Sequence, residues 1–211
     1  MTKPILYTYW RSSCAWRVRI ALNLKGVEFE SRPVNLVTRA GEFAEECYKL
    51  NPSKKVPVLV HNGNAISESL AIIEYIDEVF PGTSFLPKDP VKKAQARAVA
   101  LHIACGMQPI QNLRVLQKLN AEEAGKGPKW AAYWLTEGMR ELEELINKSA
   151  GKYAVGDEVT IADICIPSIL YNARSRWGVD LTPFTTVLRI EEELKKLSAF
   201  EAAIPEKQPD A

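Results

Sequence analysis

The sequence changes from a strand-like to a helix-like pattern at RSSCAWRVRIAL, residues 11–22. Residues 4–9 before it are rich in β-branched and aromatic side chains, which predicts a short strand. Apolar residues over 15–25 are spaced densely enough for a largely buried helix, and Gly26 stands where a helix C-cap belongs. Because ligands bind at the carboxyl ends of strands in open α/β sheets, this junction is the first candidate site.

The alternation of strand and helix continues to residue 79. Strands are predicted over 28–34, 56–60 and 65–66, and helices over 42–50 and 67–79. The Asn62-Gly63 pair between the last two strands is a hairpin signal, because both residues tolerate the positive φ of a tight turn. The whole order predicts a small α/β domain with a mixed sheet.

Beyond a stretch rich in Pro and Gly, strand patterns stop and apolar residues recur at helical spacing. Helices are predicted over 89–119, 130–148, 161–174 and 186–197. Pro109 falls inside the first of them and should kink it. We expect an α/β domain over 1–82 and an all-helical domain over 89–211, whose tail frays from Pro205.

One helix start in the second half carries a reciprocal capping box. In Thr160-Ile161-Ala162-Asp163 the threonine caps the amide of Asp163, and the carboxylate reaches back to Thr160. Aspartate shortens the reach that glutamate would give but keeps the same chemistry. We interpret Asp163 as part of the start of a core helix, with a catalytic role as the alternative.

The composition is that of an ordinary globular protein of 211 residues and 23.6 kDa. Lys and Arg number 27 against 26 Asp and Glu, which argues against a nucleic-acid partner, because such proteins concentrate positive charge. No apolar stretch reaches the roughly 18 residues of a membrane-spanning helix. The first residues lack the apolar region of a signal peptide, so we expect a cytoplasmic protein without membrane association.

Four cysteines and two histidines restrict the chemistry that the chain offers. The cysteines lie more than thirty residues apart, so they form neither a redox pair nor a zinc pattern in the sequence. The two histidines, His61 and His102, are too few for a His-rich metal site, and we expect no metal. Catalysis would have to use hydroxyls, thiols, amides and backbone donors.

Ser12, Ser13 and Cys14 fall where the first helix is predicted to begin. A helix start offers unpaired backbone N–H groups and the positive end of the helix dipole, which favour an anion. Two hydroxyls and a thiol there could stabilise a thiolate, either that of Cys14 or one brought by a ligand. The alternative is that Ser12 or Ser13 is a helix N-cap and nothing more.

Residues 12–22 closely resemble the signature of zeta-class glutathione transferases, the family of maleylacetoacetate isomerases. The similarity continues in order through most of the chain, over 50–52, 55–59, 68–75, 86–90, 108–113 and 155–163. The Ser-Ser-Cys and Gln-Pro-x-Gln-Asn-Leu runs are specific to the class, whereas the Val-Pro and Glu-Ser pairs occur in glutathione transferases broadly. The resemblance implies a glutathione transferase fold, with an N-terminal thioredoxin-like domain that binds glutathione and a C-terminal helical bundle that binds substrate.

The resemblance implies glutathione as the cofactor. Its binding residues in the first domain would be Ser12, Ser13, Cys14, Ala15, Trp16, Arg17, Glu42, Val56, Glu68 and Ser69. Val56-Pro57 matches a cis-proline turn whose backbone pairs with glutathione, although the sequence alone favours an ordinary trans bond. Ser69 would receive the γ-glutamyl carboxylate at a helix start, behind a Glu68 that is Gln in many members. Glu42 lies near a glutathione-contacting Gln of the family, beside a local difference in length.

In the second domain the implied glutathione contacts are Gln108, Asn112, Leu113 and Arg114. Without the resemblance, these residues could equally form a solvated or dimer-facing stripe. Arg176 aligns with an arginine that binds a substrate carboxylate, but Arg174 competes for that role because the local register differs. Arg11 and Arg17 add positive charge beside the thiolate, which suits a dianionic substrate.

The implied reaction is glutathione-dependent cis–trans isomerisation of maleylacetoacetate to fumarylacetoacetate in tyrosine and phenylalanine breakdown. Ser12 or Ser13 would stabilise the glutathione thiolate, which adds to the cis double bond, allows rotation and leaves again. A homodimer and a side activity as a transferase are implied too. Three alternatives use the same site: a detoxifying transferase or peroxidase, a thiol reductase with Cys14 as nucleophile, and a module that binds without turnover.

Overall fold

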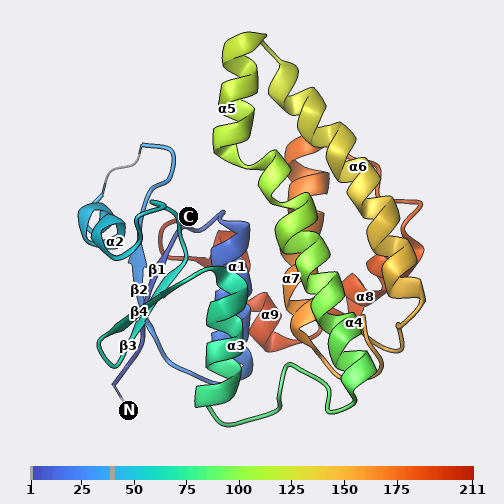
Figure 1. The fold of residues 1–211 in the computed structure, drawn as a ribbon, viewed down its shortest axis with the longest axis horizontal. Helices are drawn as coiled ribbons and strands as arrows, with labels where there is room; N and C mark the ends of the chain where they lie inside the picture. The colour runs from blue at the N-terminus through green and yellow to red at the C-terminus, as the bar shows by residue number, and fades with distance from the viewer. Residues whose placement is uncertain (1, 39–40) are drawn as a thin grey trace. The chain divides into compact units, whose positions relative to one another are not determined.

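The structure is a computed structural model that describes residues 2–38 and 41–211. The chain divides into two compact units (Figure 1). The first contains Met1–Ser84 together with Lys196–Ala211, and the second contains Phe85–Lys195. This division differs from the expected helical domain of 89–211 in its last residues, because apolar side chains of that segment are buried in the first unit instead.

A four-stranded mixed sheet lies at the centre of the first unit. Its strands are β1 (Ile5–Thr8), β2 (Glu30–Pro33), β3 (Val58–His61) and β4 (Asn64–Ser67), in the order β2-β1-β3-β4. β1 runs parallel to β2 and antiparallel to β3, so Tyr7 lies between Arg32 and Val58. Asn62 and Gly63 have φ of 50° and 78°, as a two-residue hairpin requires. The predicted mixed sheet and hairpin are confirmed.

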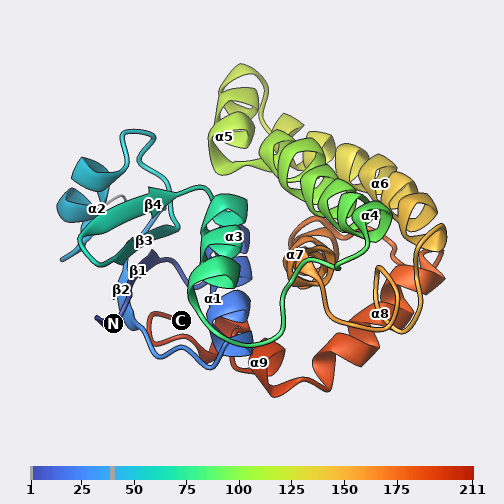
Figure 2. The ribbon, with the colours of Figure 1, turned by 60° about the horizontal axis from the view of Figure 1, so that its bottom comes forward.

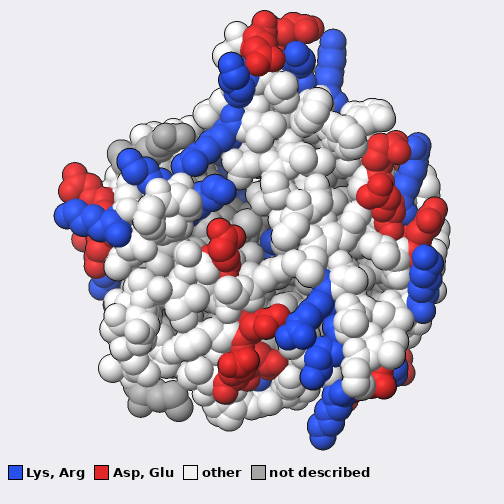
Figure 3. All heavy atoms as spheres, in the orientation of Figure 1, with Lys and Arg blue, Asp and Glu red and all other residues white. Residues whose placement is uncertain are grey.

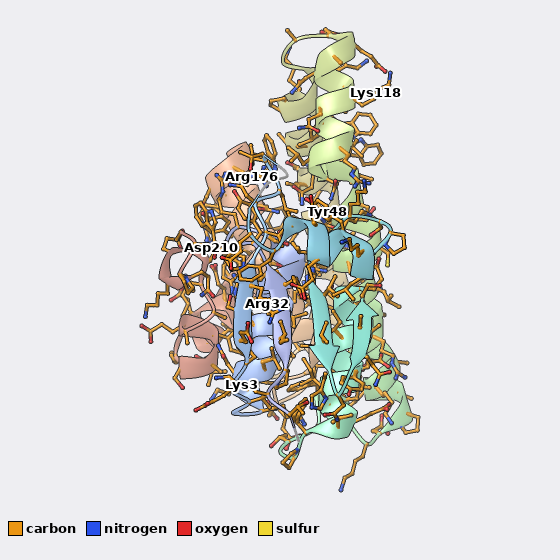
Figure 4. The ribbon with its side chains drawn as sticks, turned by 90° about the vertical axis from the view of Figure 1, so that its left-hand side faces the viewer. Lys3, Arg32, Tyr48, Lys118, Arg176 and Asp210 are labelled. Carbon is orange, nitrogen blue, oxygen red and sulfur yellow. The ribbon has the colours of Figure 1, made fainter. Side chains whose placement is uncertain are left out.

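Helices cover both faces of this sheet. α1 (Ser13–Leu24) and α3 (Ser69–Val79) pack against each other on one face, and α2 (Ala44–Leu50) lies on the other (Figures 1 and 2). Successive side chains of a strand point to opposite faces, which places Tyr7 with Cys47 of α2 in one apolar cluster. Arg32 lies on this α2 side as well, where its guanidinium donates to Tyr7 Oη at 3.0 Å and to Glu46 at 2.9 Å (Figure 4).

The end of the chain is folded onto the first unit. α9 (Ser198–Glu201) packs against α1, and the short turn η4 (Pro205–Lys207) follows it. Pro205 is buried, and the Gln208 side chain donates to the carbonyl oxygens of Ala202 and Ile204 at 3.1 and 2.8 Å. The expectation that the tail frays from Pro205 is therefore wrong.

The second unit is a group of helices. They are α4 (Pro90–Leu101), η1 (His102–Met107), η2 (Pro109–Gln111), α5 (Leu113–Glu122), α6 (Lys126–Asn147), α7 (Ile161–Tyr171), η3 (Asn172–Arg176) and α8 (Thr185–Lys195). The single helix predicted over 89–119 is wrong, although the prediction of a disturbance at Pro109 is confirmed. Proline has no amide hydrogen to donate and its ring clashes with the preceding turn, so the chain widens into the π turn η1, tightens into the 3₁₀ turn η2 and restarts as α5.

The predicted capping box opens α7. Asp163 is fully buried, and its Oδ2 accepts from the Thr160 amide at 2.8 Å and from the Thr160 hydroxyl at 2.9 Å. Its Oδ1 accepts from the Ala154 amide at 2.9 Å. Burial raises the pKa of Asp163 to about 6, while these hydrogen bonds act in the opposite direction. All the bonds serve to fix a helix start, which agrees with the structural interpretation of Asp163.

The surface carries charges of both signs. Figure 3 shows Lys and Arg side chains interspersed with Asp and Glu over the visible face, as expected for a formal net charge of +1. Within the described ranges, no helix combines the length and apolarity needed to cross a membrane. Residues 2–38 and 41–211 contain no cluster of three or more His, Cys, Asp or Glu side chains suited to a metal ion.

Candidate active site

Ser12 precedes the first helix of the α/β unit. Its backbone is extended, with φ −71° and ψ 115°, and its Oγ accepts a hydrogen bond from the Ala15 amide at 3.2 Å. Ser12 is therefore the N-cap of α1, which confirms the capping interpretation. A hydroxyl that accepts through a lone pair keeps its proton for a second bond, so the cap leaves Ser12 able to donate to an anion.

The neighbours of Ser12 differ in exposure. Ser13 is buried, with 8% of its surface exposed, whereas Ser12 and the free thiol of Cys14 are half-buried. Ala15 and Trp16 are buried in the first turn of α1. Of the two serines, Ser12 thus offers the more accessible hydroxyl, and Cys14 offers a thiol close to it in the sequence.

Two arginines near this helix start lie in different environments. Arg11 is exposed, and its guanidinium carbon lies 4.7 Å from the centre of the Trp10 ring. Arg17 is only 1% exposed, and its Nη1 donates to Ser69 Oγ at 3.4 Å. Arg17 therefore connects α1 to the start of α3 and places a positive charge beside Ser69, whereas Arg11 stays at the surface.

The residue before α3 has an unusual backbone conformation. Glu68 has φ 70° and ψ 117°, which costs a residue other than glycine about 1–3 kcal/mol. Its side chain is exposed, while Ser69 directly after it is buried. Backbone strain of this kind concentrates at functional sites, so the conformation supports a ligand-binding role for the Glu68–Ser69 pair.

Val56 belongs to the same part of the first unit. The Val56–Pro57 peptide bond is cis, as the resemblance implies and contrary to what the sequence alone favours. Val56 is 6% exposed and lies in one apolar cluster with Tyr9, whose carbonyl oxygen accepts from the Ser12 amide at 2.9 Å. Tyr9 thus shares an apolar cluster with Val56 and a backbone hydrogen bond with Ser12. Glu42 is exposed in the turn before α2, and the described residues show no hydrogen bond between it and this group.

The predicted contact residues of the second unit surround the break at Pro109. Gln108 is half-buried at the end of η1, and Asn112 is the N-cap of α5, with its Oδ1 accepting from the Arg114 amide at 3.2 Å. Leu113 and Arg114 are exposed on the first turn of α5. Because the chain passes from a π turn to a 3₁₀ turn to an α-helix, these side chains do not lie on the single helix that was predicted over 89–119.

The structure separates the two arginines that competed for a substrate carboxylate. Arg174 forms two hydrogen bonds with Glu191 of α8, at 3.0 and 2.7 Å, and this carboxylate raises the pKa of Arg174. The positive charge of Arg174 is therefore paired with the Glu191 carboxylate. Both side chains line a cavity of about 660 Å³, whose other lining residues belong to α8. Arg176, labelled in Figure 4, instead lies with its guanidinium carbon 5.1 Å from the centre of the Trp177 ring.

Comparison with known proteins places this geometry in a family. The glutathione S-transferase N-terminal domain family matches residues 11–79, and the C-terminal domain family matches residues 113–207. A "Probable maleylacetoacetate isomerase" of Caenorhabditis elegans is 52% identical over 208 residues, which are 99% of this chain and 96% of that protein.

Solved structures agree with the sequence relatives. Maleylacetoacetate isomerase from Anaeromyxobacter dehalogenans 2CP-1, described as having glutathione bound in its active site, has a TM-score of 0.89 and 39% identity, covering 99% of this chain and 98% of that one. Maleyl pyruvate isomerase, described as a bacterial glutathione S-transferase of the zeta class, has a TM-score of 0.91 and 33% identity, covering 98% and 99%. The chain belongs to the zeta-class glutathione transferases. The expected glutathione transferase fold is confirmed.

One amide side chain of this zeta-class transferase, from the Gln-Pro-x-Gln-Asn-Leu run, is buried. Gln111 is 3% exposed, and its Oε1 accepts from Trp177 Nε1 at 3.2 Å and from Asn172 Nδ2 at 3.5 Å. It therefore connects the η2 turn, which leads into Asn112, to η3, which ends at Arg176. The helical spacing of Gln108, Gln111 and Asn112 predicts amides on adjoining faces, but it predicts neither the burial of Gln111 nor its partners in η3.

Proposed function

We propose that the protein catalyses the glutathione-dependent cis–trans isomerisation of maleylacetoacetate to fumarylacetoacetate, with a secondary glutathione transferase activity. The observation that carries this is the half-buried Ser12 hydroxyl at the start of α1, in a chain whose full-length relatives are named maleylacetoacetate isomerases. The place of the reaction in tyrosine and phenylalanine catabolism follows from the substrate.

The residues of the first unit suit glutathione group by group. Ser69 at the start of α3, with the Arg17 guanidinium beside it, offers a hydroxyl and a positive charge to the γ-glutamyl carboxylate. The backbone of Val56 precedes a cis proline at the end of β3 nearest Tyr9, where it can pair with a peptide-like ligand. Ser12 supplies a hydroxyl for the sulfur. Glutathione thus fits the donors that this unit presents.

When bound, glutathione supplies the thiolate nucleophile that makes a cis double bond temporarily able to rotate. An unperturbed thiol has a pKa near about 8.5, so at neutral pH the protein must favour the ionised form. Ser12 does so by donating its hydroxyl proton, and the start of α1 adds the positive end of the helix dipole. Ser13 is buried, so Ser12 is the assigned donor, and the equally half-buried Cys14 is separated from it by the Cys14→Ala variant described below.

The negative charges of the substrate require donors of their own. In the second unit Arg176 is assigned to a substrate carboxylate because it aligns with the family's carboxylate-binding arginine, and a guanidinium forms charge-assisted hydrogen bonds with such a group. Arg11 at the surface of the first unit adds a second positive charge. Gln108, Asn112, Leu113 and Arg114 stay assigned to glutathione or substrate contact through the family motif they form.

A test uses maleylacetone as substrate with a catalytic amount of glutathione. The wild-type protein should turn over many equivalents of substrate and leave the tripeptide unchanged, and the Cys14→Ala variant should do nearly the same. Stoichiometric consumption of glutathione would instead indicate a transferase. If Cys14→Ala abolishes glutathione-linked disulfide reduction while Ser12→Ala is harmless, the thiol reductase is the correct alternative. Binding of glutathione with no turnover would leave a binding module.

A cytoplasmic homodimer completes the proposal. It rests on the resemblance to glutathione transferases and on exposed apolar side chains of α4 and α6, such as Leu101 and Trp134, which are 48% and 38% exposed. Light scattering on the purified protein should give twice the chain mass of 23.6 kDa. A mass of one chain would contradict the homodimer without affecting the proposed chemistry.

A further inference from the structure

In the loop between β1 and α1, both backbone polar groups of Trp10 form hydrogen bonds with side chains. The Trp10 amide donates to Asp210 Oδ2 at 3.0 Å, and the Trp10 carbonyl oxygen accepts from Arg19 Nη2 at 3.0 Å. Both partners belong to the first unit, although Asp210 lies 200 positions further along the chain (Figure 4). Trp10 is two residues before Ser12, so whatever holds Trp10 sets the approach of the chain to the candidate site.

Arg19 connects the loop to the C-terminal segment. It is 1% exposed, and its Nη1 donates to Thr8 Oγ1 at 3.1 Å and to the Tyr9 carbonyl oxygen at 3.4 Å. Its Nε and Nη2 both donate to the Ala203 carbonyl oxygen, at 3.3 and 3.1 Å. One guanidinium therefore contacts residues 8–10 on one side and the chain after α9 on the other, in the fixed fork geometry of arginine.

The segment from 196 to 211 is well anchored on α1. Phe200 and Ala203 are 4% and 0% exposed, and Asn23 Nδ2 of α1 donates to the Ala199 carbonyl oxygen at 3.0 Å. The Asp210 carboxylate is placed by this anchoring. Its Oδ1 is buried and accepts no hydrogen bond from the described part of the chain, while its charge acts favourably on that of Arg19. The hydrogen bond of this carboxylate to the Trp10 amide and its charge beside Arg19 both act on the loop between β1 and α1.

We propose that Asp210 and Arg19 are positioning residues, which together hold the Trp10 peptide so that the Ser12 hydroxyl meets the sulfur of glutathione. The inference rests on the proposed function. Tyr9 makes the connection direct, because its carbonyl oxygen accepts both from Arg19 and from the Ser12 amide at 2.9 Å. A displacement of about 1 Å in a reacting group can lower the rate by about a hundredfold, so a loosely held loop would lower kcat.

The test replaces Asp210 in the full-length chain, since Arg19 is too deeply buried to change safely. We expect Asp210→Ala to raise the pKa of the bound glutathione thiol, measured by the ultraviolet absorbance of the thiolate. We also expect it to lower kcat by about tenfold or more, with little change in KM for glutathione. Asp210→Asn keeps an acceptor for the Trp10 amide and should recover most of the activity. The matched control is Glu201→Gln, which removes a surface ion pair with Lys207 on the same segment and should change nothing.

Each outcome has a distinct meaning. If Asp210→Ala ionises glutathione and turns over as the wild type does, or if Glu201→Gln loses activity to the same degree, the positioning role is wrong. A purely structural role would lower the thermal stability of Asp210→Ala while kcat at 25 °C and the thiol pKa stayed unchanged, which would overturn it as well. If the wild-type protein itself fails to ionise bound glutathione, the proposed function fails, and this result is distinguishable from the others.

Discussion

The proposed function gives Ser12 two roles that the sequence presented as alternatives. Its oxygen accepts from the Ala15 amide and so caps α1, and in the proposed reaction its hydroxyl proton is donated to the thiolate. Spacing alone could place Ser12 and Ser13 at a helix start. It could not tell them apart, because their exposure depends on the path of the loop from Tyr9 and not on the two residues themselves.

Replacement of Ser12 should separate stability from chemistry. Ser12→Ala removes the N-cap, which should lower the free energy of unfolding by about 1 kcal/mol. It also removes the donor to the thiolate, which should lower kcat/KM by about a hundredfold. Ser12→Thr retains both groups and should lose much less of either. Urea unfolding and isomerase kinetics on the same preparations measure the two effects, and an equal kinetic loss in Ser13→Ala would assign the donor role to the other serine.

Trp177 should matter for substrate and not for glutathione. Trp177→Phe keeps an aromatic ring next to Arg176 but removes the Nε1 donor to Gln111. A partly buried hydrogen bond of this kind contributes about 1 kcal/mol, so KM for a dicarboxylate substrate should rise by about fivefold. KM for glutathione should not change. Trp134→Phe on α6 is the control, and an equal effect there would show that the Gln111 bond is irrelevant.

At the scale of the elements, helix starts were easier to predict than helix interruptions. The capping box at Thr160 depends on residues three positions apart, so it can be identified in the sequence, and the structure forms it. The path around Pro109 was predicted as a kink only. How a chain absorbs a proline, here through a π turn and a 3₁₀ turn, depends on the helices that pack against it, and no local pattern records those.

Asp163 should make the stability of α7 depend on pH. Burial raises its pKa to about 6, above the ordinary value of 3.8, so the folded state binds the proton more tightly than the unfolded state does. Its contribution to stability is therefore complete below pH 4 and is lost as the pH rises to about 6, by up to about 3 kcal/mol. In Asp163→Asn this dependence should be absent.

The measurement for Asp163 is urea unfolding between pH 4 and pH 7, with the difference between wild type and variant taken at each pH. Asp180→Asn serves as the control, because hydrogen bonds from Thr182 lower the pKa of this exposed carboxyl and move its titration below that range. A constant difference between wild type and Asp163→Asn over the whole range would show that Asp163 stays ionised when folded.

At the scale of the whole molecule, the sequence predicted the two kinds of unit and the order of strands and helices from β1 to α3 correctly. The place of residues 196–211 was not predicted, because an apolar pattern shows that a segment is buried but not against which partner. Phe200 and Ala203 could have packed with the helices that precede them in the sequence. The structure buries them in the first unit, where α9 meets α1.

Phe200 should therefore stabilise the α/β unit. Phe200→Ala should lower its free energy of unfolding by about 3–5 kcal/mol, because a large buried side chain leaves a cavity. Val37→Ala, at a position that is 61% exposed in the same unit, should change it by less than about 0.5 kcal/mol. Urea unfolding of both variants compares them, and a small effect at Phe200 would mean that the segment contributes little to the unit.

The contact between Trp10 and Asp210 has a consequence for the order of events during biosynthesis. A ribosome adds roughly 5–20 residues per second, so the sheet and its first helices leave the exit tunnel many seconds before residue 210 does. Until then the loop that carries Ser12 lacks the carboxylate that fastens it. If Asp210 positions the loop as proposed, a nascent chain can hold a folded sheet and still be catalytically immature until residue 210 has been translated.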